Sequence, residues 1–500
     1  MRLTMMSLAV SAAFVAVPAA AQTPGRADLA KIVAGRHDAT VKALQDWIAL
    51  PTIAAEKRNV DQGADYMRQL ALDAGFQKAR VVQSGGVPGV FATLDAGAPV
   101  TLGIYFMYDV KQFDPAEWNT PPLKATLVDR PGEGTAIVGR GVVNQKGPQM
   151  AFLSALKAMK AAGRKLPVNL VLVAEGEEEI ASPNFPNVVA DPEVAAALKK
   201  TVGVFIPSTS QDKDGQAGIT LGAKGAVEFQ LIVGGETSDK YPKADVHSSN
   251  HARIESPAWR LVKALDSLVA DDGHTPAIDG FMENVKPLTA RQKELVAQRV
   301  AATNEAEVKR SLTVGRWINN EDYQTSSERF VSQPTVNIQG LVSGYTGVGG
   351  KTVLPGRAEA KLEFRLVPDM TKDEVVTKLK AHLAKRGFDD VKVVVSGGYG
   401  PNQTDENSPF IQAQKKVFER GGIPYTLTPR NAGSWPGVVF NGAPLNLPTG
   451  QFGVGRGGGA HAPDEWFLIR SSNPKVAGLD EATMLYVDYL YEVAKLGRRR

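Results

Sequence analysis

Residues 168–179 read VNLVLVAEGEEE, and this stretch decides the fold class of the 500-residue chain. The near-continuous apolar run over 168–174 is typical of a strand that helices cover on both faces. It ends directly in the acidic string 175–179. Because sites in open α/β sheets lie at the carboxyl ends of strands, this string is a candidate functional site.

Strand and helix patterns alternate around this stretch. Strand patterns occupy 90–94, 101–108 and 202–206, and helical patterns occupy 37–50, 61–74, 149–162, 408–420 and 479–496. The alternation predicts the α/β class, with a mixed sheet covered by helices. The stretches 114–138 and 447–459 are expected to be long loops.

The pattern changes after Lys224-Gly225. Strand patterns at 226–233, 358–366 and 391–395 are interspersed with helical patterns at 257–270, 288–302 and 372–385. Helices flanked by strands of this kind predict a separate α+β domain inserted at 225–400. The remaining segments, 22–224 and 401–500, are then expected to form one discontinuous domain.

Composition excludes several kinds of chemistry. The 57 Lys and Arg against 53 Asp and Glu leave a net charge of +4, which argues against electrostatic binding to nucleic acid or to a membrane surface. The chain has no cysteine, which excludes disulfides, thiolate metal sites and thiol catalysis. Any metal site must therefore draw on the six histidines and on carboxylates.

The first 21 residues have the pattern of a secretory signal peptide. Arg2 precedes an apolar run over 8–17, and alanines at 19–21 stand before Gln22. The later sequence contains no apolar run that approaches the 18 residues of a membrane span. We therefore expect export to the periplasm or the exterior.

Eight short strings occur in one order along the chain. They are FMYDV, GRGVVNQKG, EGEEEIAS, DVHSS, KTVLP, FRLVPDM, AGSWP and GGGAHAPDEW. Together they resemble the zinc-dependent exopeptidase family that includes carnosine dipeptidase, glutamate carboxypeptidase and aminoacylase. The resemblance implies a catalytic domain (22–224 and 401–500) with an inserted lid and dimerisation domain, a homodimer, and small amide or peptide-like substrates with a free carboxylate.

The resemblance also implies two zinc ions, but most of their ligands are replaced here. The family's metal histidine falls on Met107, its bridging aspartate on Asn144 and its second aspartate on Ser208, so only Glu179 and His461 keep a ligand. A thioether suits copper(I) better than zinc. Two dications about 3.5 Å apart repel by roughly 19 kcal/mol at an effective dielectric near 20, and Glu179 alone remains to offset that repulsion. We expect no metal or one weakly bound zinc, and no dinuclear centre.

The other site positions are carried over from the family. Glu178 falls on the general base, and burial without a nearby cation should raise its pKa. The resemblance assigns oxyanion stabilisation to His247, and substrate contacts to Thr352, Arg365, Ser434 and Asn144. An arginine suits a carboxylate because its planar fork binds both oxygens. Asp109 and Lys146 also match family positions, next to ligands that are replaced here.

Three functions remain open. The first is a hydrolase of peptide-like or N-acyl amino acid substrates, in which Glu178 delivers water. The second is a metal-independent lyase, in which Glu178 removes a proton next to a carbonyl and His247, Asn144 or His461 holds the enolate-like oxygen. The third is a binding protein, which the retained Glu178 disfavours because binding alone needs no base.

Overall fold

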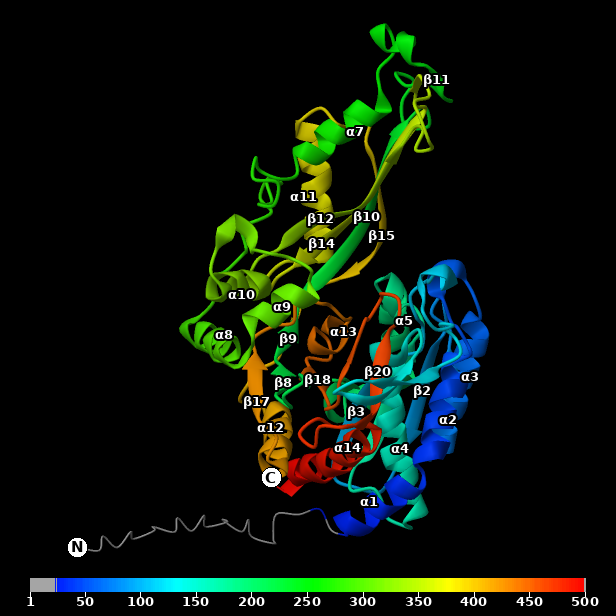
Figure 1. Ribbon diagram of the computed structural model, residues 1–500, viewed down its shortest axis with the longest axis vertical. Coiled ribbons are helices and arrows are strands. Elements are labelled where there is room, and N and C mark those ends of the chain that lie inside the picture. The colour runs from blue at the N-terminus through cyan, green and yellow to red at the C-terminus, as the bar shows by residue number, and fades with distance from the viewer. Residues whose placement is uncertain (1–22, 24, 499–500) are drawn as a thin grey trace, which may run out of the picture.

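The computed structural model describes residues 23 and 25–498; the expected signal peptide lies outside them. Figure 1 shows two bodies, a broad one that holds the first and the last helices of the described chain and an elongated one above it. The broad body is a mixed sheet covered by helices, which confirms the predicted fold class. Among the described residues, no helix is long and apolar enough to cross a membrane.

The large sheet has eight strands in the order β1-β2-β6-β3-β7-β18-β8-β17. Their bounds are β1 Lys78–Val82, β2 Gly89–Leu94, β3 Thr101–Met107, β6 Asn169–Glu175, β7 Thr201–Pro207, β8 Ala217–Thr220, β17 Tyr425–Thr428 and β18 Thr449–Phe452. Strand β3 pairs in parallel with both β6 and β7. The carboxyl ends of these three strands therefore meet at one edge of the sheet, next to the acidic string.

Helices cover both faces of this sheet because alternate side chains of a strand point to opposite sides. Ile104 and Phe106 pack into one cluster, whereas Tyr105 and Met107 pack into another. The first face is covered by α1 Arg26–Gly35, α2 His37–Ile48, α3 Val60–Ala74, α4 Gly147–Ala161, α12 Pro409–Gly421 and α14 Leu479–Val493. The second face is covered by α5 Phe185–Ala190, α6 Pro192–Leu198 and α13 Val438–Asn441.

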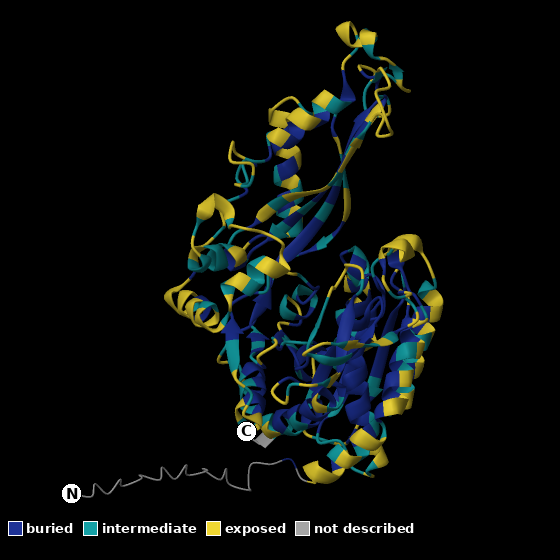
Figure 2. Cartoon of the chain, in the orientation of Figure 1, coloured by how far each residue is buried: buried dark blue, intermediate teal, exposed yellow. Residues whose placement is uncertain are grey.

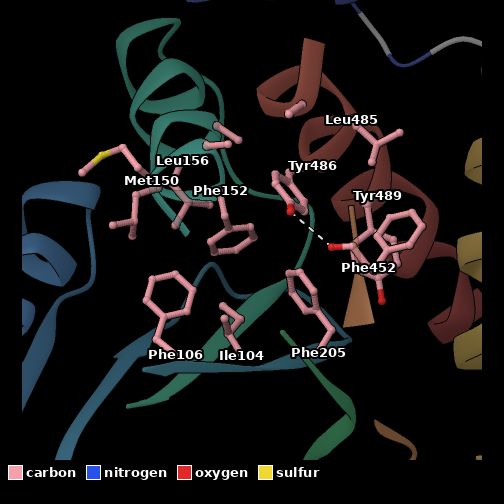
Figure 3. Packing of buried hydrophobic residues seen from close by; sticks show 14 of the residues in the cluster. Ile104, Phe106, Met150, Phe152, Leu156, Phe205, Phe452, Leu485, Tyr486 and Tyr489 are labelled. Atoms are coloured by element: carbon pink, nitrogen blue, oxygen red, sulfur yellow. Dashed lines mark hydrogen bonds between the residues drawn. The ribbon is translucent and has the colours of Figure 1, made fainter. Parts of the chain in front are cut away.

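Aromatic residues make the core under the central strands rigid. Phe152 of α4 packs edge-to-face on Phe106, Phe205 and Tyr486 (Figure 3). The hydroxyl of Tyr486 donates a hydrogen bond to the carbonyl of Phe452, at 3.2 Å. Because core residues in van der Waals contact cannot shift independently, this packing fixes the strand ends that carry the site.

The elongated body, which we call the inserted module, contains the second sheet, of order β12-β14-β10-β15. Its strands are β10 Gly225–Gly234, β12 Thr335–Ser343, β14 Arg357–Leu366 and β15 Lys392–Tyr399; its helices are α7 Pro257–Asp266, α8 Ala290–Ala302, α9 Glu305–Ser311, α10 Tyr323–Ser332 and α11 Lys372–Lys385. The short pair β11 Val246–His247 and β13 Val353–Leu354 lies at the far tip (Figure 1). Figure 2 shows that this module exposes more of its residues than the broad body. The domain limits expected from the sequence, 224/225 and 400/401, stay a prediction.

Two stretches expected to be loops contain strands. The stretch 114–138 holds β4 Thr126–Arg130 and β5 Gly134–Val138, and the stretch 447–459 holds β18 and β19 Gly457–Gly458. Strands β5 and β19 both pair with β20, Trp466–Ser471, in a sheet of order β19-β20-β5-β4. The loop prediction was wrong at these positions. Strands β4 and β5 form a hairpin, and β19 pairs with the nearby β20. Only the pairing of β5 with β20 joins segments more than 300 residues apart, and that contact is one that no local pattern reveals.

Candidate functional site

One pocket of about 460 Å³ lies where the strand ends meet the inserted module. We call it the central pocket. Eight of the residues singled out from the sequence line it: Met107, Asn144, Glu178, Glu179, Ser208, Arg365, Ser434 and His461. The structure therefore brings together residues from six of the eight strings, and Ser208 from outside them.

Only part of the acidic string faces the central pocket. Glu175 accepts hydrogen bonds from the Tyr105 hydroxyl at 2.8 Å and the Ser182 hydroxyl at 3.0 Å. Glu177 accepts from the backbone N–H groups of Val87 and Asn184. These two carboxyl groups thus hold the surrounding loops in place, and Glu178 and Glu179, on the short 3₁₀ turn Glu178–Ile180, are left to the pocket.

The Asp109 carboxyl group holds the backbone of that turn in place. Its carboxyl oxygens accept from the backbone N–H of Glu178 at 3.3 Å and of Glu179 at 3.0 Å. Burial and the charge of Glu179 raise the pKa of Asp109 to about 8. Burial, and then the charges of Glu179 and Asp109, raise the pKa of Glu178 well above its ordinary value. A carboxyl group with a raised pKa is a stronger base than an ordinary carboxylate, as general-base chemistry requires.

The loop that carries Asn144 is held by the buried carboxylate of Glu465. This carboxylate accepts from the backbone N–H groups of Gly141, Val143 and Asn144 at 2.8–3.0 Å and from the Arg140 guanidinium at 3.0 Å. Gly141 has a φ of +82°, and a side chain there would lie 2.3 Å from Val110. The backbone of the loop that carries Asn144 is therefore held in place by these hydrogen bonds, although Asn144 stands where the resemblance places an aspartate ligand.

The Asn144 side chain lies between the two residues that keep a ligand position in the resemblance. The Asn144 Nδ2 amide donates to Glu179 Oε1 at 2.8 Å and lies 3.0 Å from His461 Nε2. His461 Nε2 is also 3.1 Å from Glu179 Oε2. An amide N–H donates a hydrogen bond and does not coordinate a metal ion, so in this orientation Asn144 presents a donor to Glu179 and His461. Within the part of the chain that the structure describes, no three His, Asp or Glu side chains are grouped to hold a metal ion.

Lys111 brings a positive charge next to Glu179, one of the two residues that keep a metal-ligand position in the family resemblance. Its ammonium lies 3.6 Å from Glu179 Oε2 and donates a hydrogen bond to the Glu179 carbonyl. The same charge lowers the pKa of Glu178, against the larger effects of burial and neighbouring carboxylates. Sequence reasoning missed Lys111; its position two residues after Asp109, in the string that follows β3, was the available signal.

The opposite wall of the pocket carries an arginine and two hydroxyls. Arg365 of β14 donates from Nη1 to Ser434 Oγ at 2.6 Å, and its Nε and Nη2 bind both oxygens of Glu363. The Tyr399 hydroxyl donates to Ser434 Oγ at 3.3 Å. Arg365 and Ser434 were expected to act together on a substrate carboxylate, and the structure places them in direct contact.

Three residues carried over from the family lie away from the pocket. His247 and Thr352 are neighbours at the exposed tip of the inserted module, where Ser248 N–H donates to the Thr352 carbonyl at 3.0 Å. Within one chain they do not join the central pocket. Lys146 is buried and its ammonium donates to the carbonyls of Trp47 and Leu50. It therefore anchors the start of α4 to the end of α2, and it does not line the central pocket.

Lys224, at the start of the inserted module, gives a prediction on pH. Its side chain is buried and donates to the Gln333 carbonyl at 2.6 Å. Burial, with the charges of Arg430 and Arg365, lowers its pKa to about 8. The unfolded chain then binds more protons between pH 8 and pH 10.5, so this group's contribution to stability rises with pH across that window.

Accordingly, the free energy of unfolding of the wild type, minus that of Lys224→Met, should increase as the pH rises from 8 to 10.5. The measurement is urea unfolding of both proteins at several pH values in this range. A constant difference between the two curves would show that Lys224 has an ordinary pKa.

Known proteins share this arrangement of a strand-end pocket and an inserted module. Residues 108–489 match the peptidase family M20/M25/M40. The chain belongs to this peptidase family. The match covers more than half of the chain and includes every residue that lines the central pocket except Met107.

Curated relatives of this peptidase include dipeptidases. The Cys-Gly metallodipeptidase of Saccharomyces cerevisiae is 26% identical over 458 residues, which cover 84% of this chain and 89% of the yeast protein. The Beta-Ala-His dipeptidase of Homo sapiens is 28% identical over 386 residues, with 72% of each chain covered.

Solved structures give the same result for the fold. An M20 family metallo-carboxypeptidase from Sulfolobus solfataricus has a TM-score of 0.79 and 30% identity, with 92% of this chain and 99% of that chain covered. Human carnosine dipeptidase 1 has a TM-score of 0.77 at 22% identity, with 94% of this chain covered. The two-body architecture is therefore that of the M20 peptidases.

Proposed function

We propose that this peptidase hydrolyses small amide or dipeptide-like substrates that carry a free carboxylate, with Glu178 as the general base. The observation that carries the proposal is the placement of Glu178 on one wall of the central pocket and the Arg365–Ser434 pair on the other. The first group can accept a proton from water, and the second can bind a carboxylate bidentately. The names of the dipeptidase relatives support the same substrate class.

In this proposal the pocket's own side chains replace part of what a metal pair supplies. Lys111 balances the charge of Glu179, which otherwise would repel the proton acceptor Glu178 more strongly. Asn144 Nδ2 and His461 Nε2, 3.0 Å apart, can turn toward the substrate carbonyl and donate to its oxygen. Because hydrogen bonds replace a Lewis acid in this scheme, we expect slow turnover or a substrate with an easily broken amide.

The donor set also favours a second candidate, a lyase. The misfit between Asn144, Met107 and Ser208 and a zinc pair removes the usual means of activating water. Proton removal by Glu178 next to a carbonyl needs no activated water, and the same amide and imidazole can hold the enolate-like oxygen. The products separate the two candidates, since a lyase leaves an unsaturated product and a hydrolase does not.

The proposal extends to the protein's surroundings. We propose that it is exported to the periplasm or secreted, that it binds neither nucleic acid nor membrane, and that it works as a homodimer. The exposed His247–Thr352 tip supports the dimer, because these residues can reach substrate only in a second copy. Intact-mass measurement and sedimentation of the purified protein test the processing and the dimer.

The test of activity is a panel of dipeptides and N-acyl amino acids, each assayed with and without a chelator. Hydrolysis products that persist in chelator support the proposed hydrolase. An unsaturated product, seen by mass spectrometry and ultraviolet absorption, would select the lyase. Tight binding of panel members without any turnover would leave the binding protein and overturn the proposal.

The zinc content of the protein gives a prediction that does not depend on the activity assay. We expect the wild-type chain to bind less than one equivalent of zinc in native mass spectrometry, because only Glu179 and His461 remain as ligands, and the Lys111 ammonium and the Asn144 amide both contact Glu179. Restoring ligands in Met107→His, Asn144→Asp, Ser208→Asp and Lys111→Gln together should raise this to about two zinc ions. The single variant Lys111→Gln is the matched control for the fourfold variant. Two zinc ions on the wild type would contradict the prediction.

A further inference from the structure

A second cavity, of about 480 Å³, adjoins the central pocket. We call it the side cavity. It lies between helices α8 to α10 of the inserted module and strands β8 and β17 of the large sheet, and Figure 1 shows these helices beside the end of β17. The two cavities share four lining residues: Ser208, Thr209, Asn431 and Gln451. A molecule held by Glu178 and Arg365 can therefore extend into the side cavity past these shared residues.

One side of this cavity is apolar. Trp317 and Tyr323 stack with ring centroids 5.7 Å apart and an interplanar angle of 18°. Leu312 and Phe330 also line the cavity, and they remain 56% and 64% exposed. Large apolar side chains exposed at a concave surface are typical of ligand-binding sites, because a ligand removes them from water.

The other side carries two guanidinium groups without an acidic partner. Arg430 is 5% exposed; it donates to the carbonyl of Val331 at 2.7 Å and to Gln403 at 3.2 Å, while its buried Nε has no hydrogen-bond partner. Arg299 donates to the Thr428 hydroxyl at 2.8 Å. Among the described residues, no carboxylate forms an ion pair with either arginine; Arg299 is exposed, but a buried cation such as Arg430 ordinarily has such a partner.

We propose that the side cavity binds a second acidic group of the substrate, carried on an aromatic or other apolar body. The body would lie against Trp317, Tyr323 and Phe330, and the carboxylate would pair with Arg299 and Arg430. This inference rests on the proposed function, because it assumes that the first carboxylate is held at Arg365. It makes the substrate a diacid larger than a simple dipeptide of small residues.

The test measures binding by calorimetry to the Glu178→Gln variant, which should bind substrate without turning it over. N-acetylalanine is the reference ligand. In one pair, N-(4-carboxybenzoyl)alanine is compared with N-benzoylalanine; in the other, N-acetyl-4-carboxyphenylalanine is compared with N-acetylphenylalanine. The pairs place the second acid on either side of the amide. We expect the diacid of at least one pair to bind roughly tenfold more tightly than its partner without the second carboxylate.

Two variants and a control locate that gain. Arg299→Gln should remove the gain while it leaves the affinity for N-acetylalanine within about twofold. Val300→Trp, which fills the cavity from α8, should exclude both aromatic ligands of the pair that shows the gain. Lys293→Gln, a solvent-exposed site on the same helix, is the matched control and should change nothing. Arg299 is chosen over Arg430 because a buried arginine can be required for folding.

The outcomes separate this inference from the proposed function. Equal affinity within both pairs, or a gain that survives Arg299→Gln, overturns the second acidic site even if the wild type hydrolyses every ligand. A diacid gain that Arg299→Gln removes supports the site even if the wild type turns over none of the ligands, which would overturn only the proposed function. If no ligand binds at all, both fail.

Discussion

Glu178→Gln is expected to lower kcat by roughly 10³-fold or more while the Kd for substrate stays within several-fold. Glutamine keeps the size and the hydrogen-bonding shape of the side chain but cannot accept a proton. The surrounding turn should persist, because Asp109 holds it through the backbone N–H groups of residues 178 and 179. Steady-state kinetics and calorimetric titration of the same preparation measure the two quantities.

A matched control lies on a neighbouring turn. Glu56 ends the short turn Ala54–Glu56, which packs against the turn Glu178–Ile180, and its side chain is exposed. Glu56→Gln makes the same chemical change next to the pocket and should leave kcat unaltered. Full activity in Glu178→Gln would remove this residue from the mechanism and direct attention to Glu179 or Asp109.

The second large effect is expected at the opposite wall. Arg365→Ala should weaken the binding of a carboxylate substrate by about 3 kcal/mol, roughly 100-fold in KM, since the substrate loses a charge-assisted partner and Ser434 loses its donor. A substrate whose carboxylate is converted to a carboxamide should bind weakly to both proteins. The difference between the two substrates, in wild type and variant, isolates the charged contact.

Arg357 provides the comparison for this variant. It lies at the other end of the same strand, β14, where it pairs with Glu236 and Glu359 at the surface. Arg357→Ala should leave KM unchanged, so that any effect of Arg365→Ala cannot come from a weakened strand. If KM for the carboxylate substrate were the same in Arg365→Ala and wild type, another group would have to bind the carboxylate.

The fold class and much of the pocket could be predicted from sequence because their signals are local. The apolar run that became β6 and its acidic continuation identify a buried strand with a functional end. Short ordered strings located Arg365 and Ser434, which are 69 residues apart yet in contact. Where a residue's function depends on its own string, pattern and resemblance suffice.

The features that were missed depend on distant partners. Nothing in the string around Glu465 shows that its carboxylate holds a loop 321 to 325 residues earlier in the chain. Lys111 becomes meaningful only when the turn with Glu179 is placed against it. The side cavity likewise forms only when α8 packs against β17, and its arginines have ordinary sequence surroundings.

The way the inserted module joins the broad body has a mechanical consequence. Its first strand, β10, and its last, β15, are hydrogen-bonded neighbours, and Ala226 stands opposite both Arg365 and Tyr399. A rigid rotation of the module would therefore turn about an axis close to these three residues. The tip with His247 would sweep the widest arc, whereas Arg365, the proposed carboxylate anchor, would move least. A bound molecule could thus stay tethered by its carboxylate at the pivot while the tip swings open.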